Sequence, residues 1–138
     1  MSFNLIRTNG SQLIDVRNNY KQIADDFLPK YYTVYDNNFN ELSTLYYPDS
    51  QFTYQDNELI GFNALSQKLY ESGVYKFTHH NMTISTQPIG PSNMIITIIG
   101  LISLNDSIFT NKFVETLYIQ RNDQNKFGIC STIFKMLE

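Results

Sequence analysis

Several residue patterns that identify common protein classes are missing from this sequence. Cys130 is the only cysteine among 138 residues, so no disulfide can form within the chain, which fits a reducing compartment. No run of Lys and Arg occurs and the formal net charge is −3, so the basic footprint of a nucleic-acid-binding protein is absent. No stretch approaches the roughly 20 apolar residues of a membrane span, and the N-terminus lacks the apolar run of a secretory signal.

The motifs of common enzymes and metal centres are also missing. The sequence contains no G-x-S-x-G elbow, no glycine-rich phosphate loop and no cysteine–histidine nucleophile pattern, and its six glycines are scattered singly. His79 and His80 are adjacent, so on a strand they point to opposite faces and are poorly placed to bind one metal ion. We therefore expect a protein without catalytic residues, metal site or cofactor.

Three acidic residues beside an aromatic helix are the remaining candidates for catalysis. Asp25 and Asp26 fall in the first half of this helix and Asp36 lies at its exit. Such positions suit solvated faces and helix caps, although a buried carboxylate next to a tyrosine can act as a general base when desolvation raises its pKa. A small-molecule isomerase or dehydratase is therefore the third functional hypothesis.

Aromatic residues are abundant instead, with ten Tyr and ten Phe but no Trp. Each buries a large area, so this number indicates a wide core or a lined cavity. Tyr54, Phe77 and Phe134 are predicted to lie on three different elements. They form either ordinary core or a cavity that accepts an aromatic side chain of a partner, and the sequence leaves both readings open.

The first part of the chain is predicted to be a leader followed by a long helix. Residues 1–14 are polar and contain a turn signal, so we expect a flexible leader before a single domain at 15–138. Apolar side chains then recur at helical spacing, with Asp15 as a plausible N-cap. Pro29 interrupts this pattern, which predicts a kink or a break near residues 25–29.

The remainder is predicted to contain two short helices and several strands. A short helix at 40–47 precedes a small hairpin around residues 55–58, and a third helix runs from Gly61 to about Tyr70 with Tyr70 facing inward. The later strands are expected at 75–87 with a bulge near 80–82, at 94–104, at 113–120 and at 127–137. This order favours an α+β fold with three helices packed on one face of a bent antiparallel sheet.

The order and spacing of these elements resemble the nuclear transport factor 2 family. The resemblance runs from about Tyr20 to Gly100 with essentially no gap and continues to the last strand with one extra residue near 105–112. The matching landmarks are Phe27, Tyr31, Tyr32, Asp36, Leu42, Leu45, Tyr46, Phe52, Tyr54, Gly61, Lys68, Leu69, His79, Gln87, Pro88, Gly100, Phe113, Ile133, Phe134 and Lys135. Together they cover about four-fifths of the chain.

This resemblance implies a cone-shaped fold that forms dimers through its sheet, without enzymatic activity. It also implies nuclear import of Ran-GDP, binding of Phe-rich nucleoporin repeats, and a location in the cytoplasm, the nucleus and the nuclear pore. The strand at 94–104 is almost continuously apolar, as a sheet in a dimer interface requires. No direct contact with nucleic acid or membrane is expected.

The family's contact residues can be placed on this chain one at a time. Tyr54, Phe77 and Phe134 correspond to the wall of the cavity that receives a phenylalanine of Ran. Tyr20 corresponds to the aromatic residue that helps to hold nucleoporin phenylalanines.

The rim of that cavity departs from the family pattern. Gln55 replaces an acidic residue, Asn105 and Ser107 replace two more, and Asp106 alone keeps a charge.

Two related functions follow from the resemblance. The first is a homodimeric import factor for Ran-GDP. The second is the small subunit of the messenger-RNA export receptor, a heterodimeric relative of the same fold that does not rely on the rim acids and has a similar first helix, here Ala24-Asp-Asp-Phe27 and Tyr31-Tyr-Thr33. The sequence does not decide between a homodimer and a heterodimer, because an apolar sheet face serves both.

Overall fold

The computed structural model describes residues 12–137; residues 1–11, most of the expected leader, lie outside that range. The elements in chain order are α1 (Val16–Asn37), the 3₁₀ helix η1 (Phe39–Leu45), β1 (Tyr46–Tyr54), β2 (Asn57–Ile60), α2 (Phe62–Glu71), β3 (Phe77–Pro88), β4 (Asn93–Leu104), β5 (Asn111–Arg121) and β6 (Phe127–Leu137). Within the described residues, no helix is both long and apolar enough to cross a membrane.

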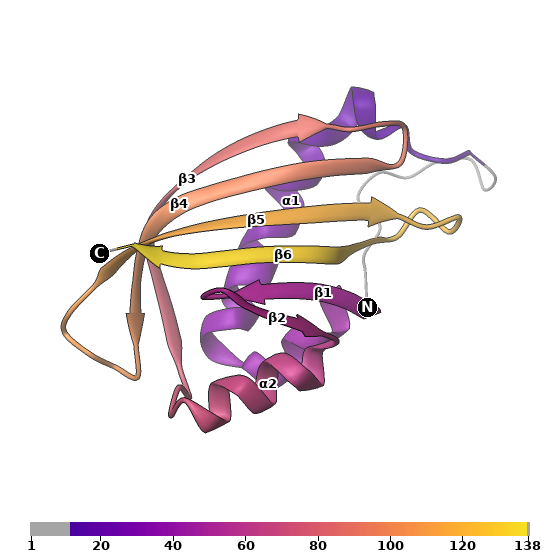
Figure 1. Cartoon of the computed structure of the whole chain (residues 1–138). Coiled ribbons are helices and arrows are strands. Elements are labelled where there is room, and N and C mark those ends of the chain that lie inside the picture. The colour runs from indigo at the N-terminus through magenta and orange to yellow at the C-terminus, as the bar shows by residue number, and fades with distance from the viewer. Residues whose placement is uncertain (1–11, 138) are drawn as a thin grey trace.

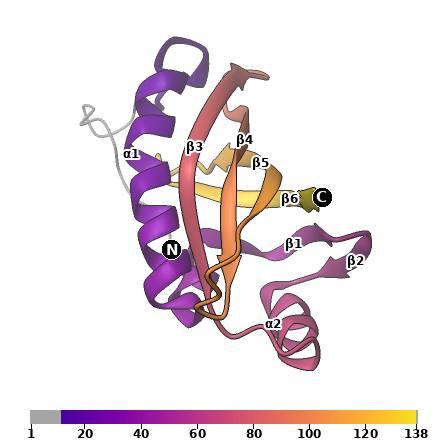
Figure 2. The ribbon, with the colours of Figure 1, turned by 90° about the vertical axis from the view of Figure 1, so that its left-hand side faces the viewer.

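The six strands form one strongly bent sheet in the order β2-β1-β6-β5-β4-β3 (Figure 1). In Figure 2, α1 runs along one side of the bent sheet and α2 lies below the β1–β2 hairpin. The predicted α+β class, with three helices on a bent sheet, is confirmed. One pair differs from the antiparallel prediction, because β1 and β6 run parallel; the two strands are far apart in sequence, so no hairpin constrains them to opposite directions.

Helix α1 begins where the sequence predicts. The Asp15 side chain accepts a hydrogen bond from the backbone N–H of Arg17 at 3.0 Å, which confirms this residue as the N-cap. The helix then continues through Pro29 to Asn37 without interruption, so a break near residues 25–29 is wrong. Phe27 and Leu28 next to the proline are fully packed in the core, and this burial offsets the roughly 3 kcal/mol that proline costs inside a helix.

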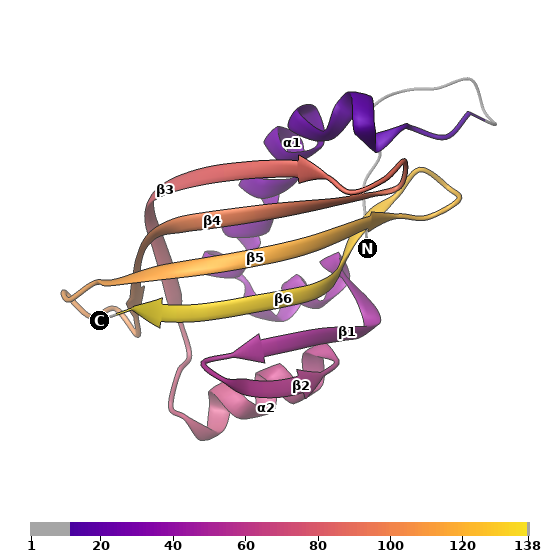
Figure 3. The same cartoon turned by 45° about the horizontal axis from the view of Figure 1, so that its top comes forward.

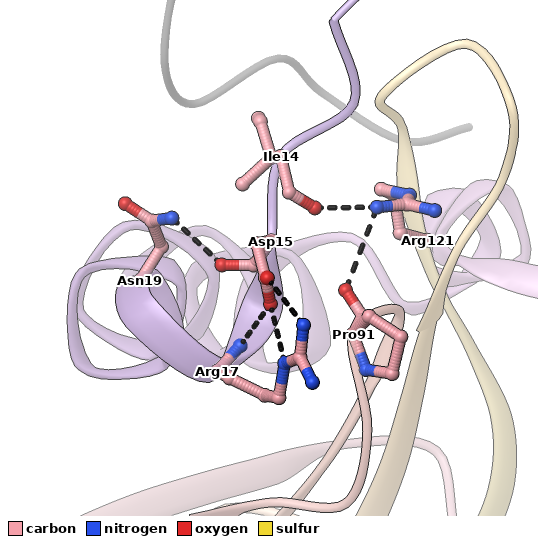
Figure 4. Close-up of polar contacts among 6 residues, drawn as sticks. All are labelled: Ile14, Asp15, Arg17, Asn19, Pro91 and Arg121. Atoms are coloured by element: carbon pink, nitrogen blue, oxygen red, sulfur yellow. Dashed lines mark hydrogen bonds and ion pairs between the residues drawn. The ribbon is translucent and has the colours of Figure 1, made fainter.

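The start of α1 is held to the far end of the sheet (Figure 4). The Arg121 guanidinium donates hydrogen bonds to the carbonyl oxygens of Ile14 and Pro91. The backbone N–H of Val16 also donates to the Pro91 carbonyl, at 2.8 Å. One arginine at the end of β5 thus connects the residue before the helix with the turn between β3 and β4, which fixes how α1 enters the fold.

The small hairpin and the third helix form as predicted, with one exception. Gln55 and Asp56 form the two-residue turn between β1 and β2 with positive φ angles of 49° and 70°, as a type I′ hairpin turn requires. Tyr70, which was predicted to face inward, is 80% exposed. It follows Leu69, which is buried, and one residue turns an α-helix by about 100°, so the two side chains cannot share the inner face.

Strand β3 contains the predicted bulge, and Gly100 on β4 lies directly beside it. The β3–β4 register shifts between His80 and Thr83, and Asn81 in the bulge has a positive φ of 50°. A Cβ atom on Gly100 would lie 2.9 Å from both the His80 carbonyl oxygen and Met82 Cγ, and 3.1 Å from the Phe113 ring. Glycine is therefore required here by close backbone approach.

We expect Gly100→Ala to lower the free energy of unfolding by about 1–3 kcal/mol, because the added methyl group overpacks a rigid backbone contact. Urea unfolding followed by circular dichroism measures this loss. Gly90→Ala is the matched control, since a Cβ there meets nothing within 4 Å, and it should leave the stability unchanged or slightly raised. Equal stability of the two variants would contradict the close approach.

Candidate functional site

The inner face of the sheet carries a continuous group of aromatic rings. Tyr54 on β1 stacks on Phe134 on β6 with ring centroids 5.3 Å apart, and Phe134 stacks on Phe113 on β5 at 5.9 Å. Phe113 meets the His79 ring on β3 at 5.3 Å. These rings come from four strands, and strand pairing places Tyr54, Phe134 and Glu115 side by side in one row across the sheet.

The structure places the three predicted wall residues in this group but not in one contact. Tyr54 and Phe134 touch directly, whereas Phe77 contacts Tyr35, Phe39 and His79 and joins the other two only through His79 and Phe113. All three predicted residues are buried. We call the rings of Tyr54, Phe77, His79, Phe113 and Phe134 the aromatic chamber.

A buried carboxylate, which the sequence interpretation missed, lies beside Phe134 in the same row of the sheet. Glu115 on β5 accepts a hydrogen bond from the Tyr32 hydroxyl at 2.8 Å and from the Tyr31 hydroxyl at 3.2 Å. The Tyr31 hydroxyl also meets that of Tyr46 at 2.9 Å. Burial raises the pKa of Glu115, while the nearby His79 and the two tyrosine hydroxyls oppose that rise.

The sequence did contain a signal for this residue. Phe113, Glu115 and Leu117 alternate along one strand, and Phe113 and Leu117 are fully buried on the inner face. A side chain two residues from each of them must point to the same face. Because burial of a carboxylate is costly without partners, hydroxyl donors from another element were to be expected.

Asp36 and His79 form a second polar pair next to the chamber. Asp36 at the end of α1 accepts hydrogen bonds from both the backbone N–H and the ring Nδ1 of His79, the former at 2.9 Å. The His79 ring packs against both Tyr32 and Tyr35, with centroids 4.6 Å from each, while His80 is exposed. Opposite orientations of the two histidines are thus confirmed.

Glu115 and the Nδ1 of His79 each form hydrogen bonds, whereas the buried Nε2 of His79 has no hydrogen-bond partner among the described residues. The pKa values of Tyr31, Tyr32 and Tyr35 are well above the usual range because of burial, and the Glu115 charge adds to the rise. Asp25 and Asp26 are exposed on α1, so neither supports a buried general base. No group of three or more potential metal ligands occurs in the part of the chain that the structure describes.

The predicted rim residues form hydrogen bonds within the chain. Gln55 accepts a hydrogen bond from the Met136 backbone N–H through Oε1 at 2.7 Å. Asn105 accepts from the backbone N–H groups of Tyr75 and Lys76 and donates to the Gly73 carbonyl at 2.7 Å. The Gln55 amide therefore holds the β1–β2 turn to β6, and the Asn105 amide holds the start of the β4–β5 loop to the segment before β3. Neither side chain carries a charge.

The remaining rim residues lie in the loop between β4 and β5. Asp106 forms an exposed ion pair with Lys76 at 2.8 Å, which raises the pKa of the lysine. Ser107 accepts a hydrogen bond from the backbone N–H of Phe109 at 3.1 Å. The one acidic side chain at this rim is thus already paired, although an exposed pair of this kind is weak and exchangeable.

The predicted nucleoporin contact and the outer sheet face lie elsewhere on the molecule. Tyr20 is half-buried on α1, packed against the edge of the core. Figure 3 looks onto the strands with α1 behind them, so this face of the sheet has no helical cover. Ile99 on β4 is 52% exposed and Ile133 on β6 is 54% exposed on this face; Ile99 pairs with Val114 on β5, and Ile133 pairs with Thr116.

A bent sheet with helices on one face, aromatic rings inside and an outer face without helical cover defines a class of cone-shaped α+β domains. The sequence profile of the nuclear transport factor 2 domain matches residues 23–136. Because this match covers most of the chain, the protein belongs to that family.

Individual relatives agree with this assignment. Nuclear transport factor 2B of Arabidopsis thaliana is 26% identical over 115 residues, which cover 83% of this chain and 91% of the relative. The solved structure of nuclear transport factor 2 from Cryptosporidium parvum has a TM-score of 0.77 and 22% identity, over 90% of this chain and 99% of the other. A Candida albicans Mtr2–Mex67 M domain complex contains a chain with a TM-score of 0.67 and 14% identity, over 84% and 93%.

Replacement of the central carboxylate tests the polar core of the chamber. We expect Glu115→Gln to raise the free energy of unfolding at pH 7 by about 1–3 kcal/mol, since the amide can still accept from Tyr32 and can donate to Tyr31 without burying a charge. Because burial raises the folded-state pKa of Glu115, the contribution of this carboxyl group to stability falls as pH rises from its unfolded-state pKa of about 4.3 through the higher folded-state pKa.

The advantage of this variant should therefore be small near pH 4 and grow toward neutral pH. Urea unfolding at several pH values measures it. Glu58→Gln, an exposed carboxylate on β2, is the control and should show no such trend. A Glu115→Gln advantage that stays constant from pH 4 to 8 would contradict the pKa assignment.

Proposed function

We propose that this protein is a nucleocytoplasmic transport factor that acts as a homodimer, carries Ran-GDP and binds Phe-rich nucleoporin repeats at the nuclear pore. The observation that supports this proposal most is the match of residues 23–136 to the nuclear transport factor 2 domain. The curated relatives at this similarity are named as nuclear transport factors. In this proposal Tyr54 and Phe134, whose rings stack with centroids 5.3 Å apart, would form the aromatic wall for a partner's phenylalanine.

The rim sets how strongly this chain would hold Ran. A lost charged partner in a desolvated interface typically costs about 2–5 kcal/mol. Gln55 and Asn105 are uncharged and bonded within the chain, so affinity would rest mainly on insertion of an apolar side chain. Binding should consequently be weaker and less dependent on salt than for a rim of three acids.

Gln55→Glu should strengthen binding to Ran-GDP by about tenfold, because the new carboxylate can keep the hydrogen bond from Met136 and adds a charge for a basic partner. Isothermal titration calorimetry with Ran loaded with GDP or GTP measures the effect. Gln51→Glu, an exposed residue on the same strand, is the matched control. Absence of GDP-selective binding in both the wild type and Gln55→Glu at tens of micromolar would reject the Ran part of the proposal.

A second candidate is the small subunit of a messenger-RNA export receptor. Two observations favour it: the rim amides fasten loops instead of offering charge, and a chain in the Mtr2–Mex67 M domain complex shares the fold. In that case the apolar outer face of the sheet would bind a large, different subunit. The two candidates therefore predict different behaviour of the purified chain.

The outer face provides the test. If the protein is a homodimer, its solution mass should be twice 16.1 kDa, and Ile133→Asp should produce a folded monomer, because a charge on an exposed apolar position disturbs only the interface. Light scattering coupled to gel filtration measures the mass. Ile89→Asp, at a position 50% exposed in the turn between β3 and β4, should remain dimeric. A wild-type monomer would favour the export-receptor subunit.

A further inference from the structure

A wide hollow at the end of the molecule that carries α2 shares only Phe77 with the aromatic chamber. It has a volume of about 690 Å³, which is within the range of small-molecule sites. Three parts of the chain line it: residues 37–40, one face of α2, and the short segment that leads into β3. Figure 1 shows α2 and the start of β3 at the same end of the fold. Neither Tyr54 nor Phe134 lines this hollow, nor does any predicted rim residue, so it is distinct from the cavity proposed for Ran.

One polar face of α2 supplies the first wall of the hollow. Asn63, Ser66, Gln67 and Tyr70 all line it. They recur at the three- and four-residue spacing that places side chains on one side of a helix. Tyr70, which turns away from the core, is 80% exposed and belongs to this face. Its ring is therefore available to a ligand in the hollow.

Asparagines at the junction of α1 and η1 supply a second wall. Asn37, Asn38 and Asn40 line the hollow from there. The side chains of Asn38, Asn40 and Asn63 form no hydrogen bond with any residue in the described range 12–137. A side-chain amide can donate and accept hydrogen bonds at the same time. Each of these three amides can thus bind a hydroxyl group of a ligand in either role.

The lining of this hollow is uncharged. Among the described residues, no Asp, Glu, Lys, Arg or His lines it, although Asp, Glu, Lys and Arg make up 17% of the chain. The charged residues next to the lining in sequence carry both signs and nearly cancel: Asp36, Glu41, Lys68, Glu71 and Lys76. A lining of this kind provides no counter-charge for a phosphate, a carboxylate or an ammonium group, so it favours a neutral polar ligand.

Aromatic rings give the hollow apolar surface as well. The rings of Phe39 and Phe77 both line it and lie with centroids 5.8 Å apart. Tyr75, in the segment before β3, is 73% exposed and also lines it. With Tyr70 on α2, two tyrosine rings at this hollow have most of their surface in water. Such a ring can cover an apolar face of a ligand while its hydroxyl group stays hydrated.

We propose that this hollow binds a neutral carbohydrate of one or two pyranose rings. A pyranose carries hydroxyl groups around its edge and C–H groups on its faces, so it matches a lining of amides and aromatic rings without any charge. The amides of Asn38, Asn40 and Asn63 bind the hydroxyl groups, and one face of the sugar ring packs on Tyr70. This activity does not depend on Ran or nucleoporin binding.

Titration of the full chain with methyl β-D-glucopyranoside and with cellobiose, followed by NMR, tests the proposal. In ¹⁵N–¹H spectra the side-chain NH₂ signals of Asn38, Asn40 and Asn63 should shift saturably, with a Kd of about 1–10 mM for the single ring. The C–H protons of the sugar should shift upfield, because they lie over a tyrosine ring.

Two small molecules separate the contributions to binding. Cyclohexanol keeps a six-membered ring but lacks the edge of hydroxyl groups, and glycerol keeps hydroxyl groups but lacks the ring. Each should bind at least about tenfold more weakly than the glucoside. Equal binding of either one, or no saturable shift below about 50 mM sugar, would overturn the proposal. The same holds if the neutral peptide Ser-Gln-Gly-Asn-Ser shifts these signals at a lower concentration than cellobiose.

Two pairs of variants separate binding from folding. Tyr70→Ala should weaken binding of the glucoside at least about fivefold, whereas Phe109→Ala, which removes a ring 76% exposed between β4 and β5, should leave it unchanged. Asn63→Ala should weaken it similarly, and Gln51→Ala, which removes an exposed amide on β1, should not. All four side chains are exposed, so the thermal stability should change little. Wild-type affinity in both Tyr70→Ala and Asn63→Ala would reject the site.

Discussion

The hydrogen bonds between Glu115 and the tyrosines of α1 are the interaction on which this fold most depends. A buried carboxylate tolerates few arrangements, because every lost donor leaves a polar group without a partner in the core. Tyr31 and Tyr32 satisfy it from one turn of α1. The helix therefore cannot slide or rotate along the sheet without breaking these bonds, whereas apolar packing alone would tolerate small shifts.

This fixed position of α1 organises the polar residues around it. Tyr32 and Tyr35 enclose the His79 ring, and Asp36 at the end of the same helix bonds to that histidine. The end of α1 is thus connected to the beginning of β3. Arg121 connects the residues at the start of α1 to the turn between β3 and β4. Between these two attachments the helix crosses the sheet with its buried face toward β3 and β4.

The sequence alone predicted most helices and strands, but it did not predict how side chains pack and pair in the interior. Helical spacing, the Asp15 cap, the hairpin and the bulge near residue 81 were predictable because each depends on neighbours a few residues away. Continuation of α1 through Pro29 was not, since burial of Phe27 and Leu28 overrides a local preference. Tyr70 was wrongly predicted to face inward, because neighbouring side chains on a helix point about 100° apart and, of this pair, only Leu69 faces the core.

The candidate site was predictable only in part, for a related reason. The family resemblance predicted Tyr54, Phe77 and Phe134 as wall residues; all three are buried, and their role as a wall stays a prediction. The partners of the rim residues depend on loops that meet across the fold, such as Asn105 with Gly73 and Tyr75. The alternation of residues along β5 was enough to predict that Glu115 points inward. Its hydrogen-bond partners were not predictable, because they are tyrosines of a helix more than 80 residues earlier.

Asn105 and Gln55 differ in how readily each could be replaced by an acidic residue. A carboxylate at position 55 could accept the same backbone N–H from Met136, so nothing in the fold opposes that change. At position 105 the side-chain amide also donates to the Gly73 carbonyl, and a carboxylate there would face that oxygen with repulsion. Position 55 can therefore accept a negative charge by a single substitution, whereas position 105 is constrained by the hydrogen bond that its amide donates to Gly73.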